Sequence, residues 1–136
     1  MQTYQGSCHC KRVRFEVDLD LSAGTTRCNC TSCFKRRWWS VRAKPANFRL
    51  QTGREELVKS SPDQGPDPGP GGFCRHCGIV PFYSVAAAEW NDGAYVGINV
   101  AALDGLDPKV LAAIPITYLD GLHDTWQPIT ELTSYL

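Results

Sequence analysis

Seven cysteines, gathered in three short clusters, are the residues of this chain whose type and spacing favour metal binding. Cysteine thiolates are soft ligands, and two of them separated by one or two residues can bind one zinc ion from a single turn. Residues 74–78 read CRHCG, and the glycine can adopt the backbone angles that let amide groups approach the sulfurs. The clusters are Cys8 and Cys10; Cys28, Cys30 and Cys33; and Cys74 and Cys77.

The division of the seven thiols predicts two different sites. Two pairs complete a closed four-thiolate site, which we expect to be a structural zinc site formed by Cys8, Cys10, Cys74 and Cys77. The remaining three thiols leave the fourth zinc position open to water or substrate, an arrangement typical of catalytic zinc. Cys28, Cys30 and Cys33 would hold this second zinc, and its site need not be fully occupied.

Three alternatives stay open on spacing alone. The thiols could be redox-active, which is disfavoured because no CxxC pair lies in a recognisable βαβ context. The second site could be structural, with His9, His76 or His123 as fourth ligand, although His9 and His76 lie within ligand turns and are expected to be exposed. Iron could replace zinc in a four-thiolate site.

Composition narrows the class of protein. The 136 residues carry 14 Lys and Arg against 14 Asp and Glu, so the zero net charge gives no general reason to bind nucleic acid or a membrane surface. No apolar run reaches the roughly 18 residues of a membrane-spanning helix, and residues 1–10 contain no apolar signal-peptide core. We expect one zinc-binding domain over residues 1–136 in the cytoplasm, where thiols stay reduced.

A basic and aromatic run, FKRRWW, follows the three-cysteine cluster. Its cations could bind the carboxylates of a substrate or form a solvated basic face, and Arg42 lies a little further on. Of Trp38 and Trp39, one should face the core and the other should be an exposed indole that lines a pocket or an interface. The predicted substrate-binding residues are Lys35, Arg36, Arg37 and Trp126.

The secondary-structure elements that hold these clusters in place can be predicted from the sequence pattern. Alternating apolar residues predict a strand over 12–18 and a short meander over 39–43, 48–50 and 57–58. Residues 80–85 and 94–100 flank a turn signal at 91–93 and predict a hairpin. One short helix is expected, capped by Asp107 and stopped by Pro115, and residues 62–72 form a proline-glycine loop that is either a surface insertion or a lid.

The cysteine motifs resemble those of a known family. GSCHC at residues 6–10 precedes a VRFEV strand, and CNCTSC at 28–33 and GGFCRHCG at 71–78 follow in order. Together they are similar to the glutathione-dependent formaldehyde-activating enzyme family, which also includes centromere protein V. The resemblance implies a mainly β fold of the β-tent type, with antiparallel β-sheets, zinc knuckles and at most one or two short helices. It also implies the same division of the cysteines between a structural and a more labile zinc.

The family chemistry is the condensation of glutathione with formaldehyde to S-hydroxymethylglutathione, a carbon-sulfur lyase-type reaction. The resemblance therefore implies an enzyme with a small-molecule thiol partner such as glutathione and the second zinc as catalyst. Three thiolate ligands weaken the Lewis acidity of that zinc, which favours thiol delivery over water activation. The bulky FKRRWW run and the loop over 62–72 depart from the usual pattern, so the thiol and aldehyde stay open. The alternative is a non-catalytic zinc-stabilised binding module.

Overall fold

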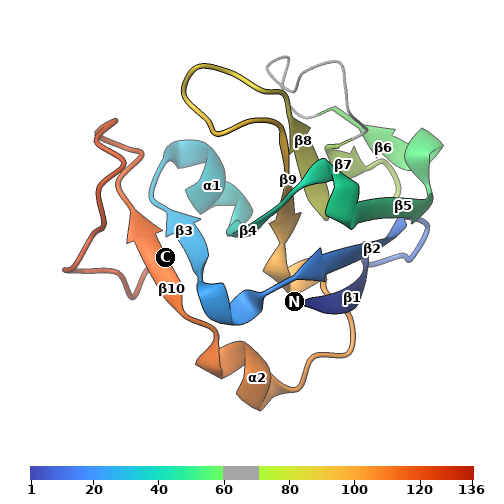
Figure 1. The fold of residues 1–136 in the computed structure, drawn as a ribbon, viewed down its shortest axis with the longest axis horizontal. Helices are drawn as coiled ribbons and strands as arrows, with labels where there is room; N and C mark the ends of the chain where they lie inside the picture. The colour runs from blue at the N-terminus through green and yellow to red at the C-terminus, as the bar shows by residue number, and fades with distance from the viewer. Residues whose placement is uncertain (60–70) are drawn as a thin grey trace.

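The structure, a computed structural model, describes residues 1–59 and 71–136 (Figure 1). Within these ranges the chain forms three β-sheets and two short α-helices, which confirms the predicted mainly β fold. The three-stranded sheet has the order β1 (Gln2–Ser7), β2 (Arg14–Leu19) and β5 (Phe48–Thr52). The five-stranded sheet has the order β10 (Ile116–Leu119), β3 (Thr25–Cys28), β4 (Trp39–Ala43), β9 (Tyr95–Asn99) and β8 (Phe82–Val85), and the small sheet pairs β6 (Leu57–Val58) with β7 (Phe73–Cys74).

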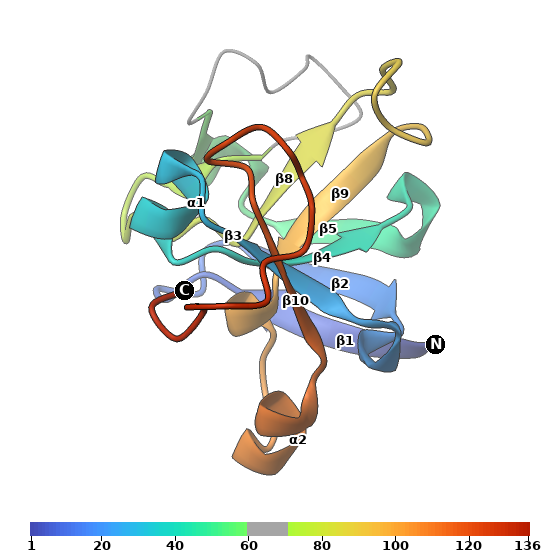
Figure 2. The same ribbon diagram turned by 90° about the vertical axis from the view of Figure 1, so that its left-hand side faces the viewer.

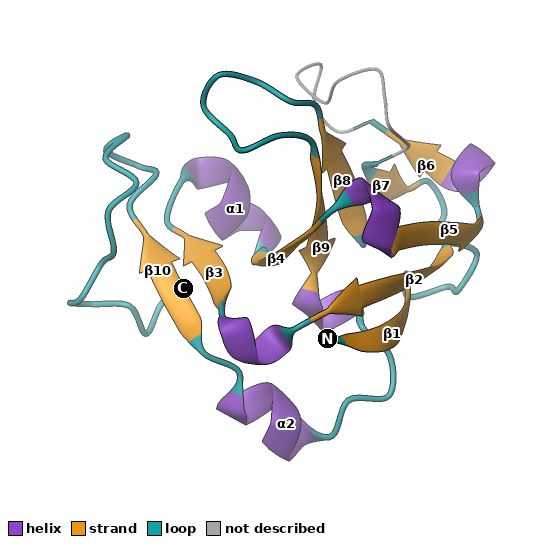
Figure 3. Ribbon diagram, viewed as in Figure 1, coloured by secondary structure: helices purple, strands orange, loops and turns teal. Residues whose placement is uncertain are grey.

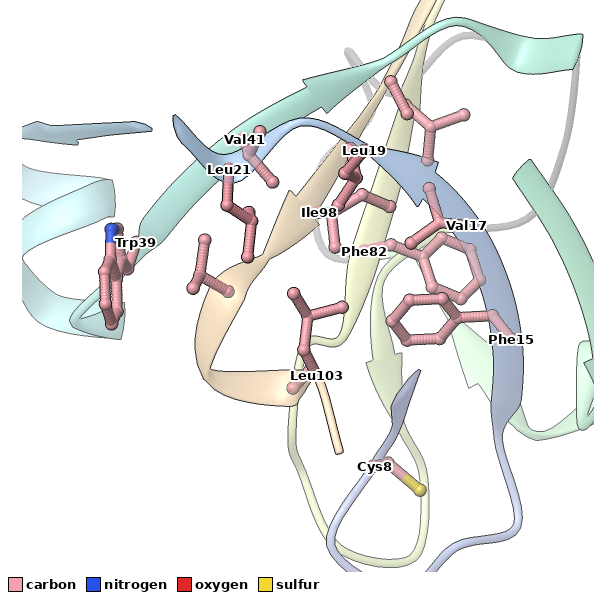
Figure 4. Packing of buried hydrophobic residues seen from close by; sticks show 14 of the residues in the cluster. Cys8, Phe15, Val17, Leu19, Leu21, Trp39, Val41, Phe82, Ile98 and Leu103 are labelled. Atoms are coloured by element: carbon pink, nitrogen blue, oxygen red, sulfur yellow. The ribbon is translucent and has the colours of Figure 1, made fainter. Parts of the chain in front are cut away.

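The core lies between the two larger sheets (Figure 4). Alternate residues of β2, namely Phe15, Val17 and Leu19, face it, because successive side chains of a strand point to opposite faces. Phe15 of β2 contacts both Phe48 and Phe82, with ring centroids 5.6 Å and 5.5 Å away. Cys8 belongs to the same buried cluster, so the end of β1 carries a thiol directly beside the core.

The predicted strands form where they were expected, but the predicted pairing of β4, β5 and β6 with one another is wrong. The strand over 12–18 is β2, and the predicted hairpin is the antiparallel pair β8 and β9. The meander is wrong, because β4, β5 and β6 belong to three different sheets. Short 3-10 turns, Pro45–Asn47 and Arg54–Glu56, separate these strands and redirect the chain, and Gly53 precedes the second turn with a φ of +88°.

The helix prediction was half correct. Helix α2 (Pro108–Ala113) forms where expected, and its N-cap Asp107 accepts a 2.7 Å hydrogen bond from the Lys109 N–H. Helix α1 (Thr31–Arg36) was not predicted, because none of its residues is buried and no apolar stripe marks it. Arg37 ends this helix in the left-handed conformation, with a φ of +53°.

Two long loops flank α1 (Figure 3). One joins β8 to β9 and the other follows β10, and Figure 2 shows the second crossing the side of the molecule that carries α1. Strands β3 and β10 form the one parallel pair among the described residues. Apart from Gly71 and Gly72, the loop predicted over 62–72 lies outside the described residues. The part of the chain in Figure 1 drawn in colour contains no helix with the length and hydropathy of a membrane span.

Candidate functional site

The structure brings together the two cysteine pairs at the ends of β1 and β7. The four sulfurs lie within 4.8 Å of one another, and Cys10 Sγ is 3.6 Å from both Cys8 Sγ and Cys74 Sγ. Four sulfurs around a zinc ion at about 2.3 Å define a tetrahedron with edges of about 3.8 Å, so these separations fit zinc. The four residues are Cys8, Cys10, Cys74 and Cys77.

Backbone groups shape this four-cysteine cluster. The Val13 N–H donates to Cys8 Sγ at 3.4 Å, and Gly78 turns the chain behind Cys77 with a φ of +75°. Burial raises the pKa of Cys8 to about 12, whereas a hydrogen bond from the Arg12 backbone lowers the pKa of Cys10 to about 6. Ionising the buried Cys8 requires a nearby positive charge, and a bound metal ion is the usual source of one.

A second cluster joins the end of β3 to the start of α1. The sulfurs of Cys28, Cys30 and Cys33 also lie within 4.8 Å of one another. The Cys30 N–H donates to Cys28 Sγ and the Cys33 N–H donates to Cys30 Sγ, both at 3.4 Å, so Cys30 is at once the helix N-cap and a member of the cluster. Three converging thiols suit a soft divalent metal such as zinc.

No histidine, aspartate or glutamate of residues 1–59 and 71–136 joins this three-cysteine cluster. His76 Nε2 lies 2.5 Å from Glu56 Oε2, and His123 Nδ1 lies 2.9 Å from the Asp120 carboxylate. The structural alternative with a histidine as fourth ligand therefore finds no support in these side chains.

The thiols of the three-cysteine cluster differ in their ease of ionisation. Burial raises the pKa of Cys28 and of Cys33. Burial also opposes ionisation of Cys30, but hydrogen bonds from the Cys33 N–H and from the neighbouring thiols outweigh it and lower the pKa of Cys30. Without a metal, the cluster therefore holds one favoured thiolate between two disfavoured ones.

The three-cysteine cluster opens into a cavity of about 740 Å³, within the range of small-molecule sites. Its floor is the face of the five-stranded sheet that points away from the core. On β4, Ser40 and Arg42 line the cavity while Val41 and Ala43 belong to the core. Cys28 and Cys33 also line it.

Aromatic side chains form much of the cavity wall. Trp38 packs on Tyr83 with ring centroids 5.0 Å apart, and a β-carbon at Gly97 would lie 2.6 Å from the Tyr83 ring, so glycine gives that ring its space. Burial, followed by the nearby Tyr95 and Cys33, raises the pKa of Tyr83. The remaining aromatic members come from β9 and the two loops and are Tyr95, Trp90 and Trp126.

The loop after β10 is fastened to the three-cysteine cluster. Asn29 Nδ2 donates to Asp120 Oδ1 at 2.9 Å, and the Leu122 N–H donates to Asn29 Oδ1 at 2.9 Å. Trp126 has a φ of +56°, an uncommon value for a bulky residue, and its Nε1 donates to Asp124 Oδ1 at 2.9 Å. This backbone turn aims the indole toward Cys28 and the cavity.

The predicted substrate-binding residues do not gather in one place. Trp126 lines the cavity, whereas Lys35 and Arg36 are exposed on α1 and do not line it. Arg37 borders a small separate pocket beside the same cysteines and donates to the Tyr135 carbonyl at 2.7 Å. Arg42, from the neighbouring strand, does line the cavity.

The expectation of one exposed indole in the Trp38 and Trp39 pair is wrong. Both side chains are buried, at 6% and 9% exposure. Trp39 belongs to the core, and its Nε1 donates to Thr25 Oγ1 at 2.7 Å. Trp38 precedes β4 instead of continuing it, and it lines the cavity from a buried position.

Sequence reasoning missed the cavity residues that lie far from the cysteine motifs. Tyr83 and Tyr95 sit on the predicted hairpin, on the face opposite its apolar residues Val96 and Ile98. The alternation of these tyrosines with buried apolar residues could have shown that they share the face opposite the core. Trp90 and Asp124 come from loops, whose course no local pattern indicates.

Comparisons with known proteins agree with the motif resemblance. The sequence model of the glutathione-dependent formaldehyde-activating enzyme family matches residues 3–131. The crystal structure of a Rhodobacter sphaeroides protein is similar at a TM-score of 0.62 and 33% sequence identity, over 83% of this chain and 99% of that one. The chain belongs to the glutathione-dependent formaldehyde-activating enzyme family.

Proposed function

We propose that this protein catalyses the reversible condensation of glutathione with formaldehyde to S-hydroxymethylglutathione, as a zinc-dependent carbon-sulfur lyase-type enzyme. The observation that carries the proposal is the three-cysteine cluster at the wall of a cavity of about 740 Å³. Membership of the family supports the choice of thiol and aldehyde.

Two zinc ions are part of the proposal. Cys8, Cys10, Cys74 and Cys77 would hold a structural zinc, and the three-cysteine cluster would hold the catalytic one. When bound there, zinc would supply the positive charge that keeps a substrate thiol ionised at neutral pH. The sulfur separations of the first cluster and the absence of a described fourth side chain at the second support this division.

The reaction forms one carbon-sulfur bond. The thiol sulfur adds to the carbon of formaldehyde, the π electrons of the carbonyl move to oxygen, and the proton lost by the thiol ends on that oxygen. Tyr83 is suited to stabilise the oxygen, because it lines the same cavity as Cys28 and Cys33 and a phenol is neutral at pH 7. A neutral phenol can donate a hydrogen bond to an oxygen as negative charge develops.

Indole side chains cover part of the cavity wall and would reduce the access of water to the reacting atoms. Trp38 is buried against Tyr83, and Trp126 lies on the opposite loop beside Cys28. Excluding water strengthens electrostatic interactions within a site and protects reactive adducts. All seven cysteines are free thiols, which suits a reducing compartment, and we propose that residues 1–136 act there as one domain.

Exchange NMR tests the proposal with the zinc-loaded protein in an equilibrium mixture of glutathione, formaldehyde and adduct. The expected result is exchange faster than in buffer alone, since the two reagents also react without a catalyst. A Cys28/Cys30/Cys33 triple serine variant should return exchange to the buffer rate. Wild-type protein with two zinc ions per chain and no acceleration would contradict the proposal and leave a zinc-stabilised binding module.

A further inference from the structure

Arg42 is the cation that β4 presents to the cavity. Strand alternation sets its direction, because Val41 and Ala43 on either side of it are buried in the core. Its guanidinium carbon lies 4.4 Å from the centroid of the Tyr95 ring, a cation–π contact that restrains the side chain at the wall. Tyr95 thus contacts Arg42 at the cavity wall.

Arg42 has no carboxylate partner within ion-pair distance in residues 1–59 and 71–136. The contrast is Arg49 on the outer face of β5, which donates to Glu16 at 2.7 Å and to Asp18 at 2.9 Å. Asp124 lines the same cavity, but its Oδ1 accepts the Trp126 Nε1–H instead. With respect to residues 1–59 and 71–136, the donors of the planar Arg42 guanidinium are therefore available to a ligand.

Strand register sets the distance from Arg42 to the cysteines. Thr26 pairs with Ser40 and Arg27 with Trp39, so the position beside Cys28 on the next strand is residue 38. Arg42 lies four residues further along, about 13 Å at roughly 3.3 Å per residue. An extended tripeptide spans about 10 Å, and the arginine side chain can bridge the remainder. A thiol of two or three carbons is too short to reach the cysteines and Arg42 at the same time.

From this geometry, and resting on the proposed function, we propose that Arg42 binds a carboxylate of the thiol substrate. The cavity is then selective for a short peptide thiol with a carboxylate remote from its sulfur, in preference to a small thiol without one. A guanidinium forms two parallel hydrogen bonds with a carboxylate, which gives both affinity and orientation. Lys35 and Arg36, the residues expected from the sequence, do not line this cavity.

The test is calorimetric binding of glutathione and of S-methylglutathione to the zinc-loaded full chain. S-methylglutathione keeps both carboxylates but cannot ionise at sulfur, so it reports carboxylate recognition apart from the reaction. Arg42→Gln should weaken both ligands by about 10- to 100-fold, the range for hydrogen bonds to a charged group. The affinity of Arg42→Lys should lie between those of wild type and Arg42→Gln, because lysine keeps the charge but not the paired donors.

Matched variants separate this effect from a general loss of charge. Arg54→Gln removes one positive charge at an exposed arginine outside the cavity and should change binding less than twofold. Arg36→Gln tests the basic run on α1, and a larger loss there than for Arg42→Gln would overturn the proposal. Circular dichroism and melting curves establish that each variant is folded.

The carboxylate itself can be identified with the glycine ethyl ester of glutathione. If the glycine carboxylate is the partner, Arg42→Gln should change the affinity for the ester little. If the γ-glutamyl carboxylate is the partner, Arg42→Gln should weaken binding of the ester as much as binding of glutathione. Equal affinities of wild type and Arg42→Gln overturn the proposal, as does an equal loss for N-acetylcysteamine, which has no carboxylate. Arg42-dependent binding without accelerated exchange would support this inference and contradict the proposed reaction.

Discussion

Gly121 lies directly against the sulfur of Cys28. A β-carbon at position 121 would come 2.5 Å from Cys28 Sγ and 2.9 Å from the ring of Trp126. Since real β-carbons do not approach other atoms this closely, a residue other than glycine at this position must displace the Cys28 sulfur or the Trp126 ring. The backbone N–H of Gly121 also donates to Cys28 and lowers the pKa of that thiol against the dominant effect of burial.

Gly121→Ala is therefore expected to damage the three-cysteine cluster and leave the four-cysteine cluster intact. The added methyl group must displace either the sulfur or the indole. Zinc per chain after dialysis against a weak chelator should fall from two to about one, with loss of exchange activity. Gly105→Ala is the control, because its β-carbon meets no atom within 4 Å, although its φ of +72° costs about 1 kcal/mol. Two retained zinc ions in Gly121→Ala would refute the packing argument.

Cys77→Ser should destabilise the whole fold. The four-cysteine cluster joins β1 to β7, and its members Cys8 and Cys74 are almost fully buried. Loss of one thiolate ligand should lower the free energy of unfolding by at least about 3 kcal/mol, because structural zinc binding contributes directly to folding. Melting curves and zinc analysis measure the effect. His76→Ala, in the same turn, should keep both zinc ions, and a fully stable Cys77→Ser protein would rule out the structural assignment.

The Cys28/Cys30/Cys33 triple serine variant should be folded but inactive. All three thiols are only partly buried, and helix α1 buries no side chain, so little of the core depends on them. Serine can also keep the N-cap that Cys30 provides, since its hydroxyl accepts a backbone hydrogen bond. Zinc should fall from two to one per chain with a small change in melting temperature. A melting temperature as low as that of Cys77→Ser would instead make the second site structural.

Trp126→Asn separates the backbone of the loop from its indole. Asparagine tolerates a left-handed φ such as the +56° of Trp126, so the loop can keep its course without the ring. The side chain is 55% exposed, and we expect little change in the free energy of unfolding. The KM for glutathione should rise about 10-fold, the size of effect expected for losing an aromatic contact. An unchanged KM would show that the indole does not contact the thiol substrate.

The ion pairs of Arg49 predict how stability depends on pH. Hydrogen bonds from Arg49, followed by one from Thr3, lower the pKa of Asp18 to about 2, and Arg49 also lowers the pKa of Glu16. A lowered folded-state pKa stabilises the protein above the ordinary carboxyl pKa of about 4, and this contribution is lost as the pH falls toward 2. Wild type should therefore be more stable than Arg49→Met at pH 6, with the difference shrinking between pH 5 and 2. Denaturant unfolding measures that difference, and zinc release in acid affects both proteins alike. A difference independent of pH would contradict the argument.

Much of this fold follows from short-range sequence signals. Alternating residues located β2 and the hairpin of β8 and β9, and Asp107 with Pro115 located α2. Both cysteine groups are also brought together as their spacing predicts. These features depend on periodicity, capping and ligand spacing, all of which are local or chemically specific.

The rest depends on contacts that local patterns do not encode. Helix α1 is short and has no fully buried side chain, so its position is set by a hydrogen bond to the Cys30 sulfur and by the left-handed Arg37. The partners of β4, β5 and β6 are chosen by the 3-10 turns between them. Arg42 and Tyr95 meet across neighbouring strands, and their contact depends on sheet order and register.

The parallel pairing of β3 with β10 also sets the order in which the surroundings of the two cysteine clusters are completed during synthesis. Every cysteine of the four-cysteine cluster is present once residue 77 has left the ribosome, so the proposed structural zinc could bind while translation continues. The thiols of the three-cysteine cluster are made earlier, yet β10 begins 39 residues after Cys77 and Gly121 follows it by 44. A nascent chain can therefore gather its four-cysteine cluster before the loop after β10 can close beside the three-cysteine cluster.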